Sequence, residues 1–312
     1  MPRAVLTHGH ADHARAGHRA VLATPETLAI LKARYGETAA ASYQPLRYGE
    51  AVTLGEARLW LAPAGHVLGS AQAVIEWRGR RAVVSGDYKR RADPTCAPFE
   101  TVRCDLFVTE ATFGLPVFRH PPAEGEVRRL LHSLAVFPER THLLGAYALG
   151  KAQRMVRLLR LAGYERPIHL HGAMTGLMAL YQDFGIDLGR LEPVSGRKGE
   201  RLPGEIVVAP PSAIADRWSR RFADPVTAVA SGWMRVRARA RQSRAELPLV
   251  VSDHADWDEL LQTLREVEAG EVWVTHGSEE ALCHAAAGLG IRARALSLVG
   301  RGEAEQEASA PA

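Results

Sequence analysis

The chain has 312 residues, 46% of them hydrophobic, and a formal net charge of +4. This length and composition can bury a large core in one large or two modest domains, and no stretch approaches the roughly 18 uninterrupted apolar residues of a membrane-spanning helix. The N-terminus lacks the positively charged start and apolar segment of a signal peptide, and the three cysteines show no Cys-x-x-Cys spacing. We therefore expect a cytoplasmic globular protein with reduced thiols and no membrane partner.

The pattern of apolar residues predicts alternating helices and strands, which is typical of an α/β fold. A helix is expected to run from Thr24, which can cap it and is followed by proline, to about Arg34. Residues 51–61 and 73–77 are predicted strands on either side of a Gly-rich loop. Further along, we expect a helix over 150–161, a strand over 168–170, a helix over 256–267 and a disordered tail over 303–312.

Three histidines and an aspartate lie in the short run His8-Gly-His-Ala-Asp-His13. Imidazole and carboxylate groups on one turn supply enough donors to begin two adjacent metal sites. A His-rich turn can also be a solvated surface loop, so further ligands elsewhere in the sequence decide between the two interpretations.

Three residues of the ligand type follow apolar runs at places where strands are expected to end. These residues are His66, Asp87 and His276. Apolar, β-branched runs that stop at Gly or Thr beside such a residue are typical of buried strands that bring side chains to one rim of a sheet. Enzymes with two metal ions draw their donors from several distant segments, and these three residues complete such a set.

The order of these motifs resembles the metallo-β-lactamase superfamily and, within it, the β-CASP nucleases. The segments Thr109–Gly114, Ser252–Trp257 and Thr275–Gly277 are similar to the acidic motif and to the second and third histidine motifs of that family. The segment Tyr147–Arg154 is similar to the helix start with which the family's inserted domain begins. In the sequence of the segment Ser252–Trp257 and in its short length, the chain most resembles the ligase-associated DNA exonucleases of bacteria.

The resemblance implies an α/β fold built as a metallo-β-lactamase αββα sandwich with an inserted α/β domain of the β-CASP type. Residues 1–115 and 246–312 are expected to form the two parts of the sandwich, and residues 116–245 the insert. The superfamily usually has one or two strands before its first histidine motif, whereas seven residues precede it here. We therefore expect either a start site placed too late or a sheet with open edges.

The resemblance also implies two divalent metal ions and a ligand set for each. His8, His10 and His66 are expected to hold the first ion, Asp12, His13 and His276 the second, and Asp87 is expected to bridge them. Zinc is the expected metal because the donors are mostly imidazoles, and manganese can occupy similar mixed sites. A hydroxide held by the two ions would attack the phosphorus of a phosphodiester.

Asp12, Glu110 and His254 are the catalytic residues that the resemblance implies. His254 is expected to protonate the leaving oxygen or to hold the phosphate. Glu110 is expected to orient His254 and to fix its tautomer through a hydrogen bond.

Positive charge is concentrated in the middle of the chain, where residues 116–245 contain 21 basic and 11 acidic residues and the remainder contains 18 and 24. The arginines at 235, 237, 239 and 241, followed by Arg244, alternate with small or apolar residues, so a strand would present several guanidinium groups on one face. Phosphates of nucleic acid suit such a row. A solvated basic face is the other interpretation. The predicted contacts with nucleic acid are Arg235, Arg237, Arg239, Arg241, Ser70 and Lys89.

A second basic cluster surrounds Trp218 and consists of Arg217, Arg220 and Arg221. Trp218 or Trp233 could stack on a base. Each tryptophan could instead belong to the core.

The function that the resemblance implies is that of a metal-dependent DNA exonuclease in DNA end processing and repair, with DNA as partner in preference to RNA and with a functional link to a DNA ligase and a helicase. An RNA-processing ribonuclease of the same fold is the alternative, which a preference for ribose-containing substrates would favour. A catalytically inactive nucleic-acid-binding subunit is the third interpretation, and the presence of every metal and acid motif opposes it.

Overall fold

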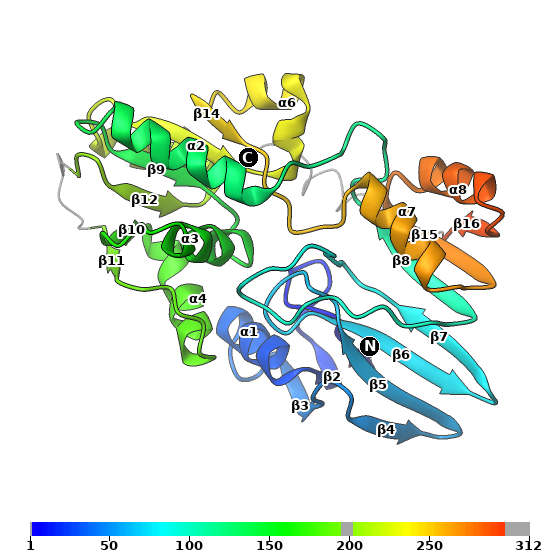
Figure 1. The fold of residues 1–312 in the computed structure, drawn as a ribbon. Helices are drawn as coiled ribbons and strands as arrows, with labels where there is room; N and C mark the ends of the chain where they lie inside the picture. The colour runs from blue at the N-terminus through cyan, green and yellow to red at the C-terminus, as the bar shows by residue number, and fades with distance from the viewer. Residues whose placement is uncertain (1, 195–201, 297–312) are drawn as a thin grey trace. The chain divides into compact units, whose positions relative to one another are not determined.

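The computed structural model describes residues 2–194 and 202–296, and the chain divides into two compact units (Figure 1). The first unit contains residues 2–119 and 253–296, and the second contains residues 120–194 and 202–252. The second unit is therefore an insertion in the sequence of the first.

The first unit contains two β-sheets. The small sheet has three parallel strands in the order β1 (Arg3–Val5), β2 (His18–Ala23) and β3 (Ala40–Pro45). The strands of the large sheet are β4 (Ala51–Leu54), β5 (Ala57–Pro63), β6 (Ala71–Trp77), β7 (Arg80–Val84), β8 (Leu106–Ala111), β15 (Glu271–Gly277) and β16 (Ala293–Ala295). Their order is β16-β15-β8-β7-β6-β5-β4, in which the pairs from β4 to β7 are antiparallel and those from β7 to β16 are parallel.

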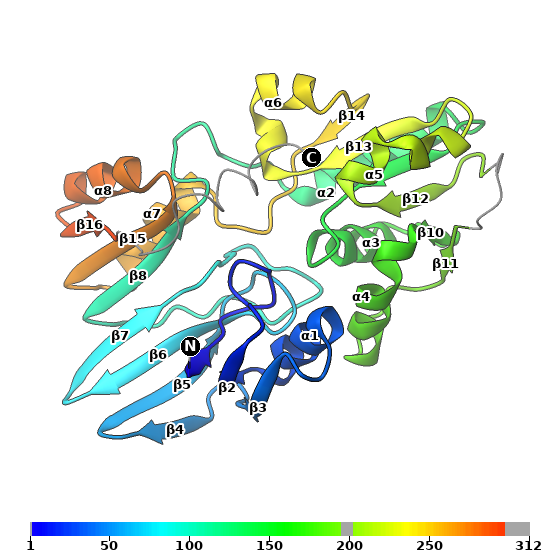
Figure 2. The same cartoon turned by 180° about the vertical axis from the view of Figure 1, so that it is seen from behind.

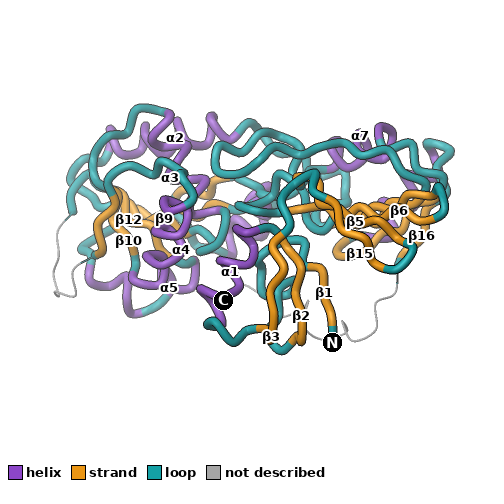
Figure 3. Tube along the Cα trace, turned by 90° about the horizontal axis from the view of Figure 1, so that it is seen from below, coloured by secondary structure: helices purple, strands orange, loops and turns teal. Residues whose placement is uncertain are grey.

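Three buried clusters stack the helices and sheets of this unit into four layers. Helix α1 (Pro25–Tyr35) places Leu28 and Leu31 against Val21 of the small sheet. The two sheets meet through Leu22 and Leu61, and Figure 3 shows strands β1 to β3 apart from those of the large sheet. Helices α7 (Trp257–Glu266) and α8 (Glu279–Gly288) cover the other face of the large sheet through a third apolar cluster. The predicted αββα order is confirmed.

The second unit is built on one parallel sheet. Its strands are β9 (His142–Gly145), β10 (Ile168–Leu170), β11 (Leu191–Pro193), β12 (Ile206–Ala209), β13 (Val226–Ala230) and β14 (Leu247–Leu249), in the order β11-β10-β12-β9-β13-β14. Its helical segments are α2 (Ala123–Val136), α3 (Lys151–Leu161), α4 (Gly172–Asp183), α5 (Pro211–Ala215), η1 (Arg217–Arg221), η2 (Gly232–Arg235) and α6 (Arg237–Gln242). Helix α2 lies in front of the sheet in Figure 1, and α5 lies in front of it in Figure 2, which is seen from behind. Strands β9 and β12 are buried throughout, as expected when helices cover both faces of a parallel sheet.

Several predicted elements are confirmed. Thr24 caps α1, since its Oγ1 accepts a hydrogen bond of 3.2 Å from the N–H of Thr27. The predicted helices over 150–161 and 256–267 are α3 and α7, and the predicted strand over 168–170 is β10. Asp256 caps α7 in a capping box with Glu259.

Other predictions about the fold are wrong. Residues 51–61 form two strands rather than one, because the chain turns at Gly55, which has φ of +64°. Residues 235–244 form the end of η2 and helix α6 rather than a strand. The domain boundaries at 115 and 245 stay predictions: the two compact units of the structure divide after Arg119 and after Ser252, and β14 pairs with β13 within the second unit.

Residues 3–5 form strand β1, which pairs with β2, so the short segment before the histidine-rich loop does contribute a strand. The predicted tail over 303–312 lies outside the described residues. Among the helices that the structure describes, none combines the length and the apolar character needed to cross a bilayer.

Candidate metal centre

The histidine-rich loop follows β1 and packs against α1. A turn closed by a hydrogen bond of 2.8 Å from the N–H of Ala14 to His10 O shapes the loop. Gly9 lies so close to α1 that a Cβ atom there would be 2.5 Å from Ile30 Cγ2. Arg34 Nη1 of the same helix donates a hydrogen bond of 2.7 Å to Gly9 O. Glycine is therefore required between the first two histidines for this close approach.

His66 follows β5 in a loop that several contacts hold in place. Gly65 has φ of +73°, and a Cβ atom there would be 2.3 Å from Lys89 O, so this position requires glycine. Ser70 Oγ accepts a hydrogen bond of 3.0 Å from the N–H of His66. His66 Nδ1 donates to Asp253 O over 2.8 Å, because a carbonyl can only accept. The neutral ring therefore has its lone pair on Nε2, the atom that would bind a metal.

Asp87 follows β7, and His276 lies near the end of β15. Gly86, just before Asp87, has φ of +58°, and a Cβ atom there would be 2.6 Å from Thr7 Cβ. His276 has φ of +66°, at the point where the pairing of β15 with β8 shifts register. This backbone conformation costs a non-glycine residue about 1–3 kcal/mol. The N–H of His276 donates to Glu279 Oε1 over 2.9 Å, which helps to hold the residue in place.

The structure brings the predicted metal ligands together in two adjacent groups. One group is His8, His10, His66 and Asp87, the other is Asp12, His13 and His276, and within each group the ligand atoms lie within 4.8 Å of one another. Asp87 lies between the groups, since its Oδ2 is 3.5 Å from both His8 Nε2 and His13 Nε2. One carboxylate oxygen therefore faces ligands of both groups, which is the arrangement expected of a bridging residue.

These donors fit divalent metal ions. Four ligand atoms around zinc at its usual bond lengths lie roughly 3.3 Å apart, and His66 Nε2 is 3.0 Å from His10 Nδ1 and 3.8 Å from Asp87 Oδ2. Two buried atoms, His8 Nε2 and Asp87 Oδ1, have no hydrogen-bond partner among the described residues. A buried polar atom without a partner is costly, and a bound cation would satisfy both. The predominance of imidazole suits zinc, and the carboxylates also suit manganese.

The electrostatics of the cluster favour the protonation states that bind metal. Burial, followed by the nearby His13, holds the pKa of His8 well below its usual value. Burial, followed by His254, does the same for the pKa of His66. Burial opposes the charge of Asp87, but the imidazoles around it outweigh this effect and hold its pKa well below the usual range. Neutral imidazoles and an ionised carboxylate are therefore available as ligands.

A carboxylate and an imidazole form a pair beside the ligands. Glu110 is buried in β8, and its Oε1 and Oε2 lie 3.1 and 3.0 Å from Nδ1 of His254. The His254 ring packs 4.6 Å from the ring of His66, measured between centroids. Burial lowers the pKa of His254, but the neighbouring Glu110 outweighs burial and raises this pKa to about 9. The pair is therefore arranged as an imidazolium held by a carboxylate.

Two residues that the sequence did not single out hold this pair and the loop of Asp87 together. The N–H of Tyr88 donates to Glu110 Oε1 over 2.8 Å. Arg91 Nη2 lies 2.6 Å from Asp256 Oδ2, and Arg91 Nε lies 3.0 Å from Glu259 Oε1, both at the start of α7. Tyr88 makes this contact through its backbone, so the identity of the residue does not indicate the contact in the sequence. The contact of Arg91 joins segments far apart in the chain.

Ser70 and Lys89, the two phosphate contacts predicted in the first unit, are buried in the structure. Ser70 is buried, and its hydroxyl accepts hydrogen bonds from the N–H groups of His66 and Val67, so it shapes the ligand loop. Lys89 is also buried. Both residues belong to the packing beneath the ligands.

The predicted arginine contacts lie in the second unit, whereas every predicted ligand lies in the first. Arg235, Arg237 and Arg241 are exposed on η2 and α6, and Arg239 is half-buried. The guanidinium carbon of Arg239 lies 5.8 Å from the centre of the Trp233 ring. The predicted row along one face of a strand does not exist, because a helix distributes alternate residues around its axis.

Trp218 is half-buried in the second unit. It packs against a small core cluster that contains Leu143 and Phe222. Arg221 lies over its ring at 5.1 Å, and the ring of His171 lies 4.6 Å away. Of the two interpretations of this residue, the structure supports a place at the edge of the core.

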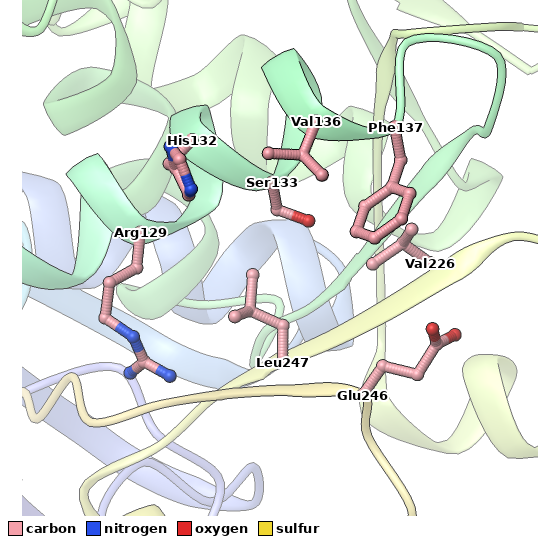
Figure 4. Close-up of a pocket in the computed structure, with 8 residues that line it drawn as sticks. All are labelled: Arg129, His132, Ser133, Val136, Phe137, Val226, Glu246 and Leu247. Carbon is pink, nitrogen blue, oxygen red and sulfur yellow. The ribbon is translucent and has the colours of Figure 1, made fainter.

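A cavity of 340 Å³ in the second unit contains none of the predicted site residues (Figure 4). It is lined by Arg129, His132, Ser133, Val136, Phe137, Val226, Glu246 and Leu247. Beside it, Arg129 Nη1 donates to Pro248 O over 3.1 Å, and Glu126 Oε2 accepts from the N–H of Val250 over 2.9 Å. These contacts occupy backbone groups at the edge strand β14, which would otherwise be open to pairing.

Comparisons with known proteins show what the chain is similar to. The family model described as "Metallo-beta-lactamase superfamily" matches residues 3–141. A protein of Opitutus terrae named "Probable DNA ligase" is 29% identical over 282 residues, which cover 88% of this chain and 27% of that protein. A ribonuclease of Thermus thermophilus is 31% identical over 216 residues, which cover 57% of this chain and 48% of the ribonuclease. The chain therefore spans between about a quarter and a half of these two relatives.

A solved structure of a protein of unknown function from Enterococcus faecalis has the same fold. Its TM-score is 0.61 with 16% sequence identity, and the match covers 96% of this chain and 80% of the other. At this identity the likeness concerns the fold alone.

Proposed function

We propose that this chain, which carries a metallo-β-lactamase domain over residues 3–141 and is similar to β-CASP nucleases, hydrolyses phosphodiester bonds of nucleic acid with two divalent metal ions. The observation that carries the proposal is the position of Asp87, whose Oδ2 lies 3.5 Å from an imidazole nitrogen of each ligand group. A bridging carboxylate between two sets of donors is typical of hydrolases that use a pair of metal ions.

The ligands of this chain would hold one ion through His8, His10 and His66 and the other through Asp12, His13 and His276, with Asp87 shared. Such a pair of ions supplies a water of lowered pKa and neutralises charge on the phosphate. Zinc suits these donors best, and manganese is the second candidate.

His254 supplies the proton that the leaving oxygen needs. Its Nδ1 lies against the carboxylate of Glu110, so the opposite nitrogen, Nε2, is the atom from which we propose that the proton is donated. The carboxylate keeps the ring protonated and fixes its orientation. Transfer of a proton from a positioned imidazole is commonly worth about 10² to 10⁴ in rate.

We propose DNA as the substrate, with removal of nucleotides from an end as the reaction. The support for this assignment is the relative named "Probable DNA ligase", whose similarity extends over 88% of this chain. A nuclease that trims ends and a ligase that joins them act on the same DNA substrates, so a functional link to a ligase, and to a helicase that exposes ends, belongs to the proposal.

RNA processing is the second candidate function. It is favoured by the 31% identity to a ribonuclease, although that similarity covers a smaller part of this chain, 57%. The ligand set and the pair of Glu110 and His254 would serve either substrate, because the bond that is cleaved is a phosphodiester in both.

Matched oligonucleotides test the two candidates. End-labelled single-stranded DNA, duplex DNA and RNA of one sequence are incubated with the metal-free protein and with added zinc or manganese, and the Asp87→Ala variant is the control. Metal-dependent shortening of DNA from an end, absent in the variant, is the expected result. Preferential cleavage of RNA would replace the first candidate with the second, and inactivity on all three substrates with metal bound would contradict both.

A further inference from the structure

We propose that the segment 232–244 of the second unit, formed by η2, α6 and the two residues after it, is a binding surface for the phosphate backbone of nucleic acid. We call it the α6 surface. The proposal rests on the proposed function for the choice of nucleic acid, and it adds a place where substrate is held in addition to the metal centre.

The α6 surface carries positive charge that acidic residues do not balance. No aspartate or glutamate occurs in the sequence from Pro225 to Ala245, whereas five arginines lie between 235 and 244. Within the part of the chain that the structure describes, none of these arginines forms an ion pair. Other arginines of the same unit do pair with carboxylates, namely Arg129, Arg140, Arg157, Arg166 and Arg190.

The helical form of the segment places like charges close together. Arg237 and Arg241 are four residues apart on α6 and therefore lie on one face, where like charges repel each other. Arg235 and Arg244 lie just before and just after the helix, and all four side chains are exposed. An anionic ligand that binds across them would remove this repulsion, so the arrangement is better suited to a bound polyanion than to the isolated protein.

The remaining arginine has a different role. Arg239 is half-buried, and its guanidinium carbon lies 5.8 Å from the centre of the ring of Trp233. This cation–π contact joins α6 to η2. It holds together the two helical segments that carry the four exposed arginines, so the surface has a defined conformation within the unit.

Phosphate is the anion that matches these side chains. The planar guanidinium group binds phosphate oxygens through two parallel N–H donors and keeps its charge at every relevant pH. Contacts with backbone phosphates carry no sequence information, and arginines predominate among the exposed side chains of the surface, which otherwise are Ala238 and Gln242. We therefore expect binding that is strong at low salt and independent of sequence.

The test measures binding without cleavage, so that it does not depend on the activity. Fluorescence anisotropy follows a labelled single-stranded oligonucleotide bound to the metal-free protein in the presence of a chelator, at several salt concentrations. The variant is Arg237→Gln with Arg241→Gln. Because each phosphate contact on a single strand contributes about 0.7 to the slope of log affinity against log salt, the double variant is expected to lower that slope by about 1.4. The reduction should be equal for oligonucleotides of different sequence.

A second double variant, Arg78→Gln with Arg80→Gln, removes the same net charge elsewhere. Both residues are exposed, Arg78 in the turn before β7 and Arg80 at the start of that strand, at the opposite end from Asp87, and this variant should keep the wild-type slope. Equal slopes in all three proteins would overturn the proposal, even if the wild type cleaves DNA. If the double variant Arg237→Gln with Arg241→Gln instead keeps the wild-type salt dependence for the oligonucleotide and loses binding to phosphatidylserine vesicles, that result would also overturn the proposal and would indicate a surface that binds membranes. A protein that binds through these arginines but cleaves nothing would leave the α6 surface standing and contradict the proposed function.

Discussion

The backbone N–H of Tyr88 donates a hydrogen bond of 2.8 Å to Glu110 Oε1, and Tyr88 is the residue that follows Asp87. The carbonyl of Tyr88 accepts a hydrogen bond of 2.7 Å from the N–H of Ala255, which follows His254. One residue thus connects Asp87, the proposed bridging ligand, to both members of the carboxylate and imidazole pair. A shift of this short segment is expected to disturb metal binding and proton transfer together.

Replacement of Asp87 by alanine should remove both metal ions. The side chain faces His8 and His13 of the two ligand groups at 3.5 Å, so its loss takes a ligand from each. Elemental analysis of the purified variant should find less than one equivalent of metal, and cleavage of labelled DNA should fall to background. A variant that keeps two equivalents would contradict the bridging role.

Replacement of His254 by alanine should separate the two functions of the site. Because His254 is held by Glu110 and is not among the predicted ligands of either ion, the variant should keep its metal content. The turnover rate should fall by about 10² to 10⁴ through loss of the proton donor. Loss of metal equal to that of Asp87→Ala, measured in parallel, would show that His254 is a ligand instead.

Replacement of Arg91 by alanine should lower the turnover rate while KM and metal content stay close to those of the wild type. Arg91 joins the loop of Asp87 to Asp256, two residues after His254, and small misplacement of a catalytic group costs roughly tenfold to a hundredfold in rate. Arg91→Lys should recover part of the loss.

Arg119→Ala is the matched control for this variant. Arg119 Nε pairs with Asp258 Oδ2 at 2.7 Å in the first turn of the same helix, but both side chains are exposed. Its removal should change stability by less than about 1 kcal/mol and leave turnover unchanged. If both variants lose turnover in proportion to thermal stability, Arg91 has only a structural role.

In the metal-free protein, His254 should titrate near pH 9. Burial opposes its charge, but Glu110 raises its pKa from 6.5 to about 9 in the folded state. The imidazolium is thus favoured by folding, and its contribution to stability is complete below about pH 6.5 and lost as the pH rises through 9. Titration by NMR of protein with labelled histidine should show this midpoint and a lower one in Glu110→Gln. Equal midpoints in the two proteins would rule out the carboxylate as the cause.

Three of the predicted ligands could be singled out from the sequence because each lies in a short motif at the end of an apolar run, and the structure places them close to the histidine-rich loop. His66, Asp87 and His276 follow or end strands β5, β7 and β15, and strands of one sheet bring such residues to a common edge. The contacts of Tyr88 and Arg91 could not be predicted in this way, because they depend on a backbone N–H and on segments distant in the chain.

In the arginine segment, arginines alternate with small or apolar residues with a period of two, which favours a strand. Alternation indicates a strand only when one of the two sets is buried, and neither Arg237 nor Ala238 is buried here. Arginine and alanine both favour helix, and this local preference decides the conformation where no core does. The contact of Ser70 could not be predicted either, because the sequence does not reveal that its hydroxyl accepts a hydrogen bond from the backbone of the ligand loop.

All predicted metal ligands belong to residues 2–119 and 253–296, and the segment 120–252 is inserted between them in the chain. Substitutions, insertions and deletions in that segment can therefore accumulate without altering a donor atom. Such an arrangement would allow substrate preference to change while the donor atoms stay the same, so a shared set of ligands does not by itself identify the target.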